Sequence, residues 1–389
     1  MDNVTTGGLP IHYQKLAHSL SNRGHKVTVL YADRFGSKAE PFQDECLNFI
    51  PLKFPFPKIL HTPVLSRVLR IAGLSEKVRF KEDSKIISRK LRILQEDRSF
   101  DIIESPNNGA CLDRYHLRRS KSCIRIATTD KEHSEINATP LNPYLRNLFE
   151  AEGRTFRKCP NLVTHTFAHR DNICKEYNLP AEKFTIIPLS VRIPSEDELS
   201  PERNDNRKKV LFVGRFEERK GIDIVLSMIP RVLAKEPDVE FRLVGSDPDN
   251  TYEKKFISQN PQLSDKVFFL GEKRGQELEY EYKNCTLFIA PSRYESFGLI
   301  YAEAMSFAKP AIGTRIGGIP EVIEDQVSGL LCKNESTEEF CFAVHRLLRD
   351  EDLRNKIGAA ARKRAMKYFD FDNLVIETEK YYTQIAGRG

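Results

Sequence analysis

The sequence lacks several features that mark familiar protein classes. No apolar run approaches the ~20 residues that a membrane-spanning helix needs. The eight cysteines are scattered, with no C-x-x-C pair and no histidine cluster beside them, which argues against a zinc site and against a disulfide scaffold. The first residues, MDNVTTGGLP, have neither the basic nor the apolar region of a signal peptide. These absences predict a cytoplasmic protein with reduced thiols.

Two common phosphate-binding loops are also missing. No G-x-G-x-x-G follows a strand-like run, no G-x-x-x-x-G-K-[ST] occurs, and GTRIGG at 313–318 has the wrong spacing. The dinucleotide-binding and P-loop classes therefore lose most of their support. The segment SDPDN at 246–250 looks like a D-x-D metal motif, but a polar loop after a strand is the better interpretation. We expect no cofactor and no bound metal.

The length and composition of the chain are those of an ordinary globular protein with more than one domain. Its 389 residues are too many for one typical core, so two domains are the first expectation. Hydrophobic residues make up 40% and charged residues 30%. The net charge of +6 is mild; it suggests an anionic substrate or surface and does not indicate nucleic acid, which we do not expect as a partner.

Short β-rich runs alternate with helical segments along most of the chain, which predicts an α/β protein with parallel sheets. We expect two Rossmann-like domains facing across a cleft, because ligands of such sheets bind outside the carboxyl ends of the strands. The predicted bounds are 1–188 for the N-terminal domain, 189–207 for a linker and 208–370 for the C-terminal domain. The last segment, 371–389, is predicted to be a helix that packs back toward the N-terminal domain.

The stretch VLFVGRFEERKGIDIVL, 210–226, places two cations at the tip of a predicted strand. Arg215 and Lys220 follow the strand and precede a helix, where they are suited to neutralise a diphosphate, the lysine as a point charge and the arginine as a fork. The alternative is a solvated basic loop that pairs with Glu217 and Glu218.

The stretch PSRYESFGLIYAEAM, 291–305, carries two glutamates eight positions apart. Glu295 lies in the loop before a helix that begins near Phe297 and Gly298, and Glu303 lies inside that helix. Free N–H groups at the helix start attract an anion or a sugar hydroxyl, and a carboxylate such as Glu303 can accept two hydrogen bonds from a ribose diol. The alternative is a solvated Glu295 and a Glu303 paired with a nearby lysine.

These stretches occur in order with GTRIGGIPEVIEDQVSGLL, and with TGGLP and LSNRGHKVTVL near the start. The combination resembles family 4 of the retaining glycosyltransferases, which have two facing Rossmann-like domains (the GT-B type fold). The resemblance covers nearly the whole chain and is most specific from 208 to 332. It implies catalytic roles for Arg215, Lys220 and Glu295. It also implies a larger donor-binding set: Gly7, Gly8, Arg215, Lys220, Glu295, Ser296, Phe297, Gly298, Leu299 and Glu303.

Two departures from the family pattern concern the first domain. Members usually begin with an apolar strand before the glycine pair, and here only a few residues precede Gly7, so the first N-terminal strand is expected to be missing. Many members also have a histidine after an Arg-apolar pair on an N-domain strand, where this chain has Ala127 and then Thr128. The acceptor-side candidates are Asn107, Asp130 and His133; a histidine in a loop is more often simply solvated.

Residues 51–92 form a basic stretch with eleven Lys or Arg against three acidic residues and with interleaved apolar side chains. This pattern is typical of a contact with an anionic membrane surface, so the protein is expected in the cytoplasm and peripherally at the inner membrane surface. A solvated helical face is the equal alternative.

The resemblance predicts an enzyme that moves a sugar from a UDP- or GDP-sugar to a hydroxyl of a glycan or lipid-linked glycan, with retention at the anomeric carbon. A role in cell-surface polysaccharide or glycolipid synthesis is the expected setting. The alternatives are a nucleotide-sugar epimerase, for which no acid/base pair is apparent, and a binding protein without turnover.

Overall fold

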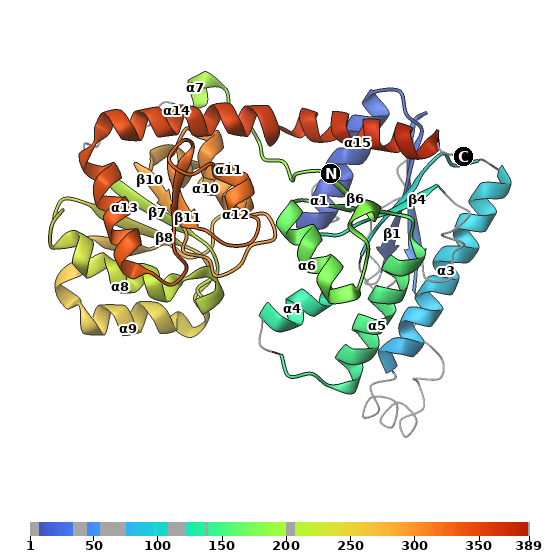
Figure 1. Ribbon diagram of the computed structural model, residues 1–389, viewed down its shortest axis with the longest axis horizontal. Coiled ribbons are helices and arrows are strands. Elements are labelled where there is room, and N and C mark those ends of the chain that lie inside the picture. Colours follow the sequence, from blue (N-terminus) through green and yellow to red (C-terminus); the bar gives the residue numbers. More distant parts are fainter. Residues whose placement is uncertain are drawn as a thin grey trace. The chain divides into compact units, whose positions relative to one another are not determined.

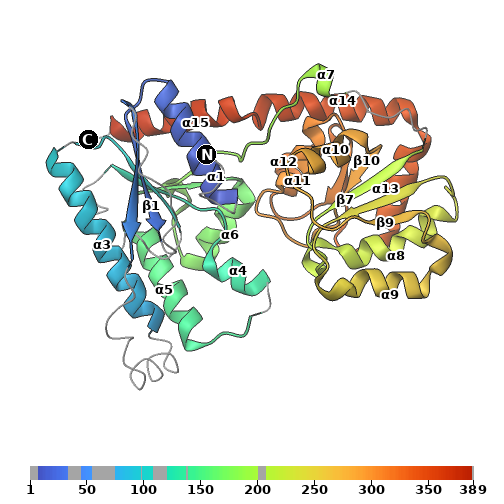
Figure 2. The same ribbon diagram turned by 180° about the vertical axis from the view of Figure 1, so that it is seen from behind.

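The computed structural model describes residues 8–33, 45–54, 75–97, 99–107, 121–136, 139–199 and 207–387. The chain divides into two compact units. Unit 1 contains Met1–Thr164, Arg170–Ile187 and Val375–Gly389, and unit 2 contains His165–His169 and Pro188–Leu374. Figures 1 and 2 show the elements of each unit from opposite sides.

Unit 2 is built on one parallel sheet with the strand order β12-β11-β10-β7-β8-β9. The strands are β7 (Lys209–Val213), β8 (Glu240–Val244), β9 (Val267–Phe269), β10 (Leu287–Ile289), β11 (Ala311–Thr314) and β12 (Gly329–Cys332). The helices are α8 (Ile222–Leu233), α9 (Thr251–Gln259), α10 (Gln276–Asn284), α11 (Leu299–Ser306), α12 (Ile319–Val322), α13 (Thr337–Arg349) and α14 (Glu351–Tyr368). Strand β7 lies between β8 and β10, so the strand order reverses there, and such a reversal is where ligands bind in open α/β sheets.

The strands of unit 2 are continuous apolar runs because helices cover both faces of the sheet. Leu211 of β7 packs in one apolar cluster with Phe288 of β10 and with α11, while Phe212 packs in the other cluster with α8 and α13. Successive residues of one strand therefore enter opposite cores. This double burial holds the carboxyl ends of β7 and β10 rigidly side by side.

In unit 1 the described strands form two parallel sheets. The larger sheet has the order β3-β4-β5-β6, from β3 (Ile103–Pro106), β4 (Ser122–Arg125), β5 (Asn161–Thr164) and β6 (Phe184–Ile186). The smaller sheet pairs β1 (Val27–Asp33) with β2 (Leu47–Lys53). The helices are α1 (Gly8–Asn22), α3 (Ser75–Asp97), α4 (Asp130–Ile136), α5 (Pro143–Lys158), α6 (Phe167–Tyr177) and α15 (Phe371–Ala386), and the first residues of α6 and of α15 belong to unit 2. The expected α/β class with two Rossmann-like domains is confirmed. No helix in the described ranges is both long and apolar enough to cross a bilayer.

The end of the chain belongs to unit 1 through several polar contacts of α15. Glu379 accepts hydrogen bonds from the Arg23 guanidinium at 2.6 Å and pairs with His25 at the same distance. The Tyr382 hydroxyl donates to Glu104 at 2.8 Å. These contacts tie α15 to β3 and to the residues just after α1, which lie in the same unit as Val375–Gly389.

The described part of the predicted linker packs as part of unit 2. Val191 is buried, and its N–H donates to the carbonyl of Phe369 at 2.8 Å. A short helix, α7 (Glu196–Leu199), follows, and Arg362 donates to the carbonyl of Pro194 at 2.8 Å. Residues 200–206 lie outside the described ranges.

Candidate functional site

The carboxyl end of β7 and the short 3₁₀ turn after it place Lys220 against the loop that follows β10. The turn, η4 (Glu218–Lys220), ends at Gly221 with φ +74°. A Cβ at Gly221 would lie 2.1 Å from the carbonyl oxygen of Pro291. Only glycine permits both this backbone conformation and this close approach. The contact therefore fixes the distance between Lys220 and the loop.

The loop from 290 to 298 holds Glu295 by its backbone and by its carboxylate. The carbonyl of Glu295 accepts the N–H of Gly318 at 2.9 Å, and the carbonyl of Ser292 accepts the Thr314 hydroxyl at 2.5 Å. The Ser292 hydroxyl donates to Glu295 Oε1 at 3.0 Å. Glu295 is thus preorganised at the tip of β10.

The same loop ends at Gly298, which precedes the first residue of α11 and has φ +100°. A Cβ there would lie 2.7 Å from Cδ2 of Tyr301. Tyr301 is itself buried and donates to the carbonyl of Ala290 at 2.6 Å. Glycine at 298 therefore lets the chain turn into α11 with the N–H groups of its first turn at the sheet's carboxyl edge.

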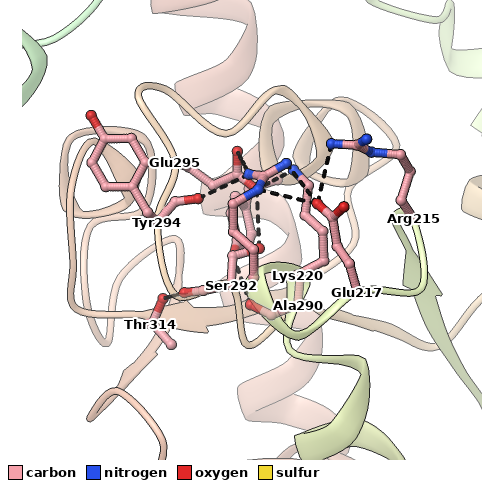
Figure 3. Close-up of polar contacts among 10 residues, drawn as sticks. Arg215, Glu217, Lys220, Ala290, Ser292, Tyr294, Glu295 and Thr314 are labelled. Carbon is pink, nitrogen blue, oxygen red and sulfur yellow. Dashed lines mark hydrogen bonds and ion pairs between the residues drawn. The ribbon is translucent and has the colours of Figure 1, made fainter. Parts of the chain in front are cut away.

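Five charged side chains meet at this edge and form what we call the strand-tip network: Arg215, Glu217, Arg219, Lys220 and Glu295. Figure 3 shows Arg215, Glu217, Lys220 and Glu295 of this network. Lys220 Nζ lies 2.6 Å from Glu295 Oε1, and Arg219 Nη1 lies 3.9 Å from Glu295 Oε2. Glu217 Oε1 accepts from Arg215 Nη2 at 3.2 Å and from Arg219 Nε at 3.1 Å.

The network contains Arg215, Lys220 and Glu295, the three residues predicted to be catalytic, and it adds two residues. The catalytic roles stay predictions. The pairing of Arg215 with Glu217 agrees with the alternative interpretation, a solvated basic loop. Arg219, which also pairs with Glu217, is not among the residues that the sequence analysis singles out. The signal for Arg219 was present in the run EERK, because a cation beside Lys220 on one tight turn reaches the same edge. With three cations and two carboxylates, the network carries a net charge of +1 (3 − 2).

Glu303 lies on α11 and contacts α10. Its Oε2 accepts the Tyr282 hydroxyl at 2.8 Å. Burial raises the pKa of Glu303, and the hydrogen bond from Tyr282 opposes that rise. The lysine partner of the alternative interpretation is therefore not the one observed, since the partner of Glu303 is the hydroxyl of Tyr282. The ribose-binding role of Glu303 stays a prediction.

Asp247, the first acid of the D-x-D-like segment, caps a helix. Its carboxylate accepts the N–H groups of Tyr252 at 3.2 Å and of Glu253 at 2.9 Å, both at the start of α9. This is the geometry of a polar loop after a strand, as the sequence suggested.

The acceptor-side candidates lie in unit 1, where two of them meet around a buried glutamate. Glu152 accepts from Asn107 Nδ2 at 3.0 Å, from the N–H of Asp130 at 3.1 Å and from the Tyr177 hydroxyl at 2.5 Å. Burial and the neighbouring Asp130 charge raise the pKa of Glu152 to about 8. Burial also raises the pKa of Asp130. Sequence reasoning missed Glu152, since a glutamate inside an amphipathic helix carries no signal.

Some of the remaining predicted residues lie in the described ranges, and others lie outside them. His133 lies on α4 and is exposed. Gly8 is the first residue of α1, whereas Gly7 lies outside the described residues. Much of the basic stretch also lies outside them, since residues 55–74 are not described.

Comparisons with known proteins show the family and the fold of the chain. The family described as glycosyl transferases group 1 matches residues 195–364, and the one described as glycosyltransferase family 4 matches residues 6–193. A glycosyltransferase of Methanocaldococcus jannaschii is 27% identical over 97% of this chain and 94% of its own length. A component of the human phosphatidylinositol N-acetylglucosaminyltransferase is 23% identical over 98% of this chain and 74% of its own.

Solved structures show the same fold. Sucrose-phosphate synthase from Thermosynechococcus elongatus superposes with a TM-score of 0.74 at 19% identity, covering 99% of this chain and 95% of that one. Anabaena HepE in complex with UDP-glucose superposes with a TM-score of 0.67 at 17% identity and 98% coverage of both chains. The chain is a glycosyltransferase of the GT-B fold. It belongs to the family 4 type of these enzymes, whose C-terminal part matches glycosyl transferases group 1.

Proposed function

We propose that the protein transfers a sugar from a nucleoside-diphosphate sugar to a hydroxyl of a glycan or lipid-linked glycan, with retention of the anomeric configuration. The observation that carries this proposal is the gathering of Arg215, Arg219 and Lys220 at the tips of β7 and β10. Cations fixed at such a strand edge suit a diphosphate. The complex of HepE with UDP-glucose supports this class of donor.

The physical role of the cations is to stabilise the leaving group. As the glycosidic bond breaks, negative charge develops on the diphosphate, and preorganised positive groups lower the energy of that state more than of the ground state. Lys220 and the N–H groups at the start of α11 act there, with Arg215. Glu295 is assigned to the donor sugar and Glu303 to the ribose. Ser296, Phe297 and Leu299 line the segment that contacts sugar and phosphate.

On the acceptor side we assign Asn107 and Asp130, with His133 as a solvent-facing neighbour. The names of two relatives support a small polar or lipid-linked hydroxyl acceptor. A D-inositol 3-phosphate glycosyltransferase of Stackebrandtia nassauensis is 25% identical over 69% of this chain and 65% of its own length. The human relative is named for phosphatidylinositol. A role in cell-surface polysaccharide or glycolipid synthesis fits such acceptors.

Contact with an anionic membrane surface belongs to the same proposal. On α3 the side chains of Lys85, Arg89 and Arg92 are exposed at spacings that place them on one face, and Ile93 beside them is 44% exposed. Cations next to an exposed apolar side chain suit a lipid headgroup layer. A cytoplasmic enzyme that works on a lipid-linked acceptor would dock in this way.

Incubation with radiolabelled UDP- and GDP-sugars tests the proposal. Transfer to an added acceptor, or slow hydrolysis without one, is the expected result. Interconversion of the sugar would instead identify an epimerase, and binding without any turnover of the whole panel would contradict the transferase assignment.

A further inference from the structure

Glu217 is held in an unusual way within the strand-tip network. Within the described residues, the hydrogen bonds and ion pairs of its side chain all end on a single oxygen, Oε1. This oxygen lies 3.2 Å from Arg215 Nη2, 3.1 Å from Arg219 Nε and 2.9 Å from Arg219 Nη2. A guanidinium group binds carboxylate and phosphate oxygens through the same kind of charge-assisted hydrogen bond. The carboxylate thus stands in the network as a phosphate oxygen would.

Glu295, the other carboxylate of the network, is held differently. It accepts the Ser292 hydroxyl as well as the Lys220 ammonium, and its backbone is tied to Gly318. Neutral donors therefore help to keep Glu295 in place whether or not an anion is present. Among the residues that the structure describes, Glu217 shows only the two arginines as side-chain partners, so a stronger anion can replace it.

Arg215 is the group most able to change partners. Its side chain is 58% exposed, and Glu217 is its one recorded partner in the described part of the chain. An ion pair this exposed contributes only about 0.2–1 kcal/mol. A diphosphate, with a negative charge on each phosphate, competes effectively for such a guanidinium.

We infer that Glu217 is an intramolecular competitor of the donor diphosphate, which must displace its carboxylate from Arg215 in order to bind. This inference rests on the proposed function, because it names the group that sets donor affinity at that same site. Glu217 is a specificity-determining residue here. A ligand with one phosphate gains less binding free energy from displacing its carboxylate than a ligand with two phosphates does.

The test measures nucleoside diphosphate binding, with UDP and GDP as probes, by titration calorimetry on the full chain. Glu217→Gln keeps the shape of the side chain and removes its charge. Glu218→Gln is the matched control, since it removes an equal charge from the adjacent, exposed position outside the network. At low ionic strength we expect Glu217→Gln to tighten binding by roughly 2- to 5-fold, the upper part of the range that a surface ion pair of this strength allows, and we expect the gain to fade in high salt. Glu218→Gln should change binding by less than about twofold.

A double-mutant cycle that combines Glu217→Gln with Arg215→Gln measures the coupling between these two residues in nucleotide binding. In the Arg215→Gln background the gain from Glu217→Gln should largely vanish, because the carboxylate no longer masks that guanidinium. An equal effect of both glutamate variants, or unchanged or weaker binding in Glu217→Gln, would overturn the inference while leaving the site itself intact.

The variant Lys220→Ala distinguishes a failure of the inference about Glu217 from a failure of the proposed function. If wild-type protein binds UDP or GDP and Lys220→Ala weakens the binding, the diphosphate site stands and the Glu217 variants decide the inference. If neither nucleotide binds, or Lys220→Ala binds as wild type does, the diphosphate site is refuted and the competitor role is refuted with it. Thermal midpoints of all variants confirm that each chain is folded.

Discussion

Replacing Lys220 with alanine removes the least exposed cation of the strand-tip network. Its side chain is 16% exposed, its Nζ lies 2.6 Å from Glu295 Oε1, and the close approach of Gly221 to Pro291 fixes its turn. A preorganised group of this kind is worth about 10²- to 10³-fold in kcat, or roughly 2.7–4 kcal/mol of barrier. Arg215→Ala should cost less, about tenfold, because solvent screens a guanidinium that is 58% exposed.

The structure also sets the expected effect of Lys220→Ala on stability. Glu295 keeps the Ser292 hydroxyl at 3.0 Å and Arg219 at 3.9 Å, so its carboxylate is not left alone. We expect a loss of about 1 kcal/mol in the free energy of unfolding, at the low end of the cost of an unsatisfied buried group. A shift of a few degrees in the thermal midpoint would follow.

The assay is the initial rate of nucleoside diphosphate release at saturating nucleotide-sugar, well below the midpoint of unfolding. Lys255→Ala is the control, because Lys255 is an exposed lysine of α9 in the same unit. Wild-type kcat in Lys220→Ala, together with a lowered thermal midpoint, would refute the reasoning. Lys220 would then be a structural partner of Glu295 and no part of the chemistry.

The remaining predictions concern the metal dependence of activity, the backbone at Gly298, the pH dependence of stability and binding to membranes. Activity should persist in excess EDTA, because in the proposed function the protein's own cations neutralise the diphosphate; complete loss restored by Mg²⁺ or Mn²⁺ would contradict this. Gly298→Ala should lower the free energy of unfolding by about 1–3 kcal/mol and slow transfer, since φ +100° and the nearby Tyr301 ring both oppose a Cβ; denaturant titration checks it. The raised pKa of Glu152, about 8, means that the folded state holds its proton longer than the unfolded chain. Between about pH 5 and pH 8 the free energy of unfolding should therefore fall by at most ~5 kcal/mol, and above pH 8 it should level off. Glu152→Gln should remove this pH dependence, and denaturation midpoints measured across pH check it. Residues 51–92 should draw the protein to anionic vesicles and release it in salt, because the attraction decays over a Debye length of ~8 Å; equal sedimentation with neutral vesicles would mean a solvated face.

The strands and helices of unit 2 could be predicted because local pattern and tertiary environment agree there. Short apolar runs become strands buried on both faces, and helix α8 places Ile222, Val225 and Ile229 on one buried face. Strand β2 escaped prediction for a local reason. It contains Pro51, which normally argues against a central strand, and it is tolerated where only β1 pairs with it in the described sheet.

The sequence by itself determined the fold class and the types of residue at the proposed donor site. Arg215, Lys220 and Glu295 follow apolar strands, and parallel strands bring their carboxyl ends to one edge whatever the details of packing. The partners were decided only by the tertiary structure. Lys220 meets Glu295 across 75 residues of sequence, Glu303 takes Tyr282 in place of a lysine, and Glu152 collects Asn107 and Asp130. Such pairings depend on how elements far apart in the sequence pack together, and no periodicity along the chain encodes them.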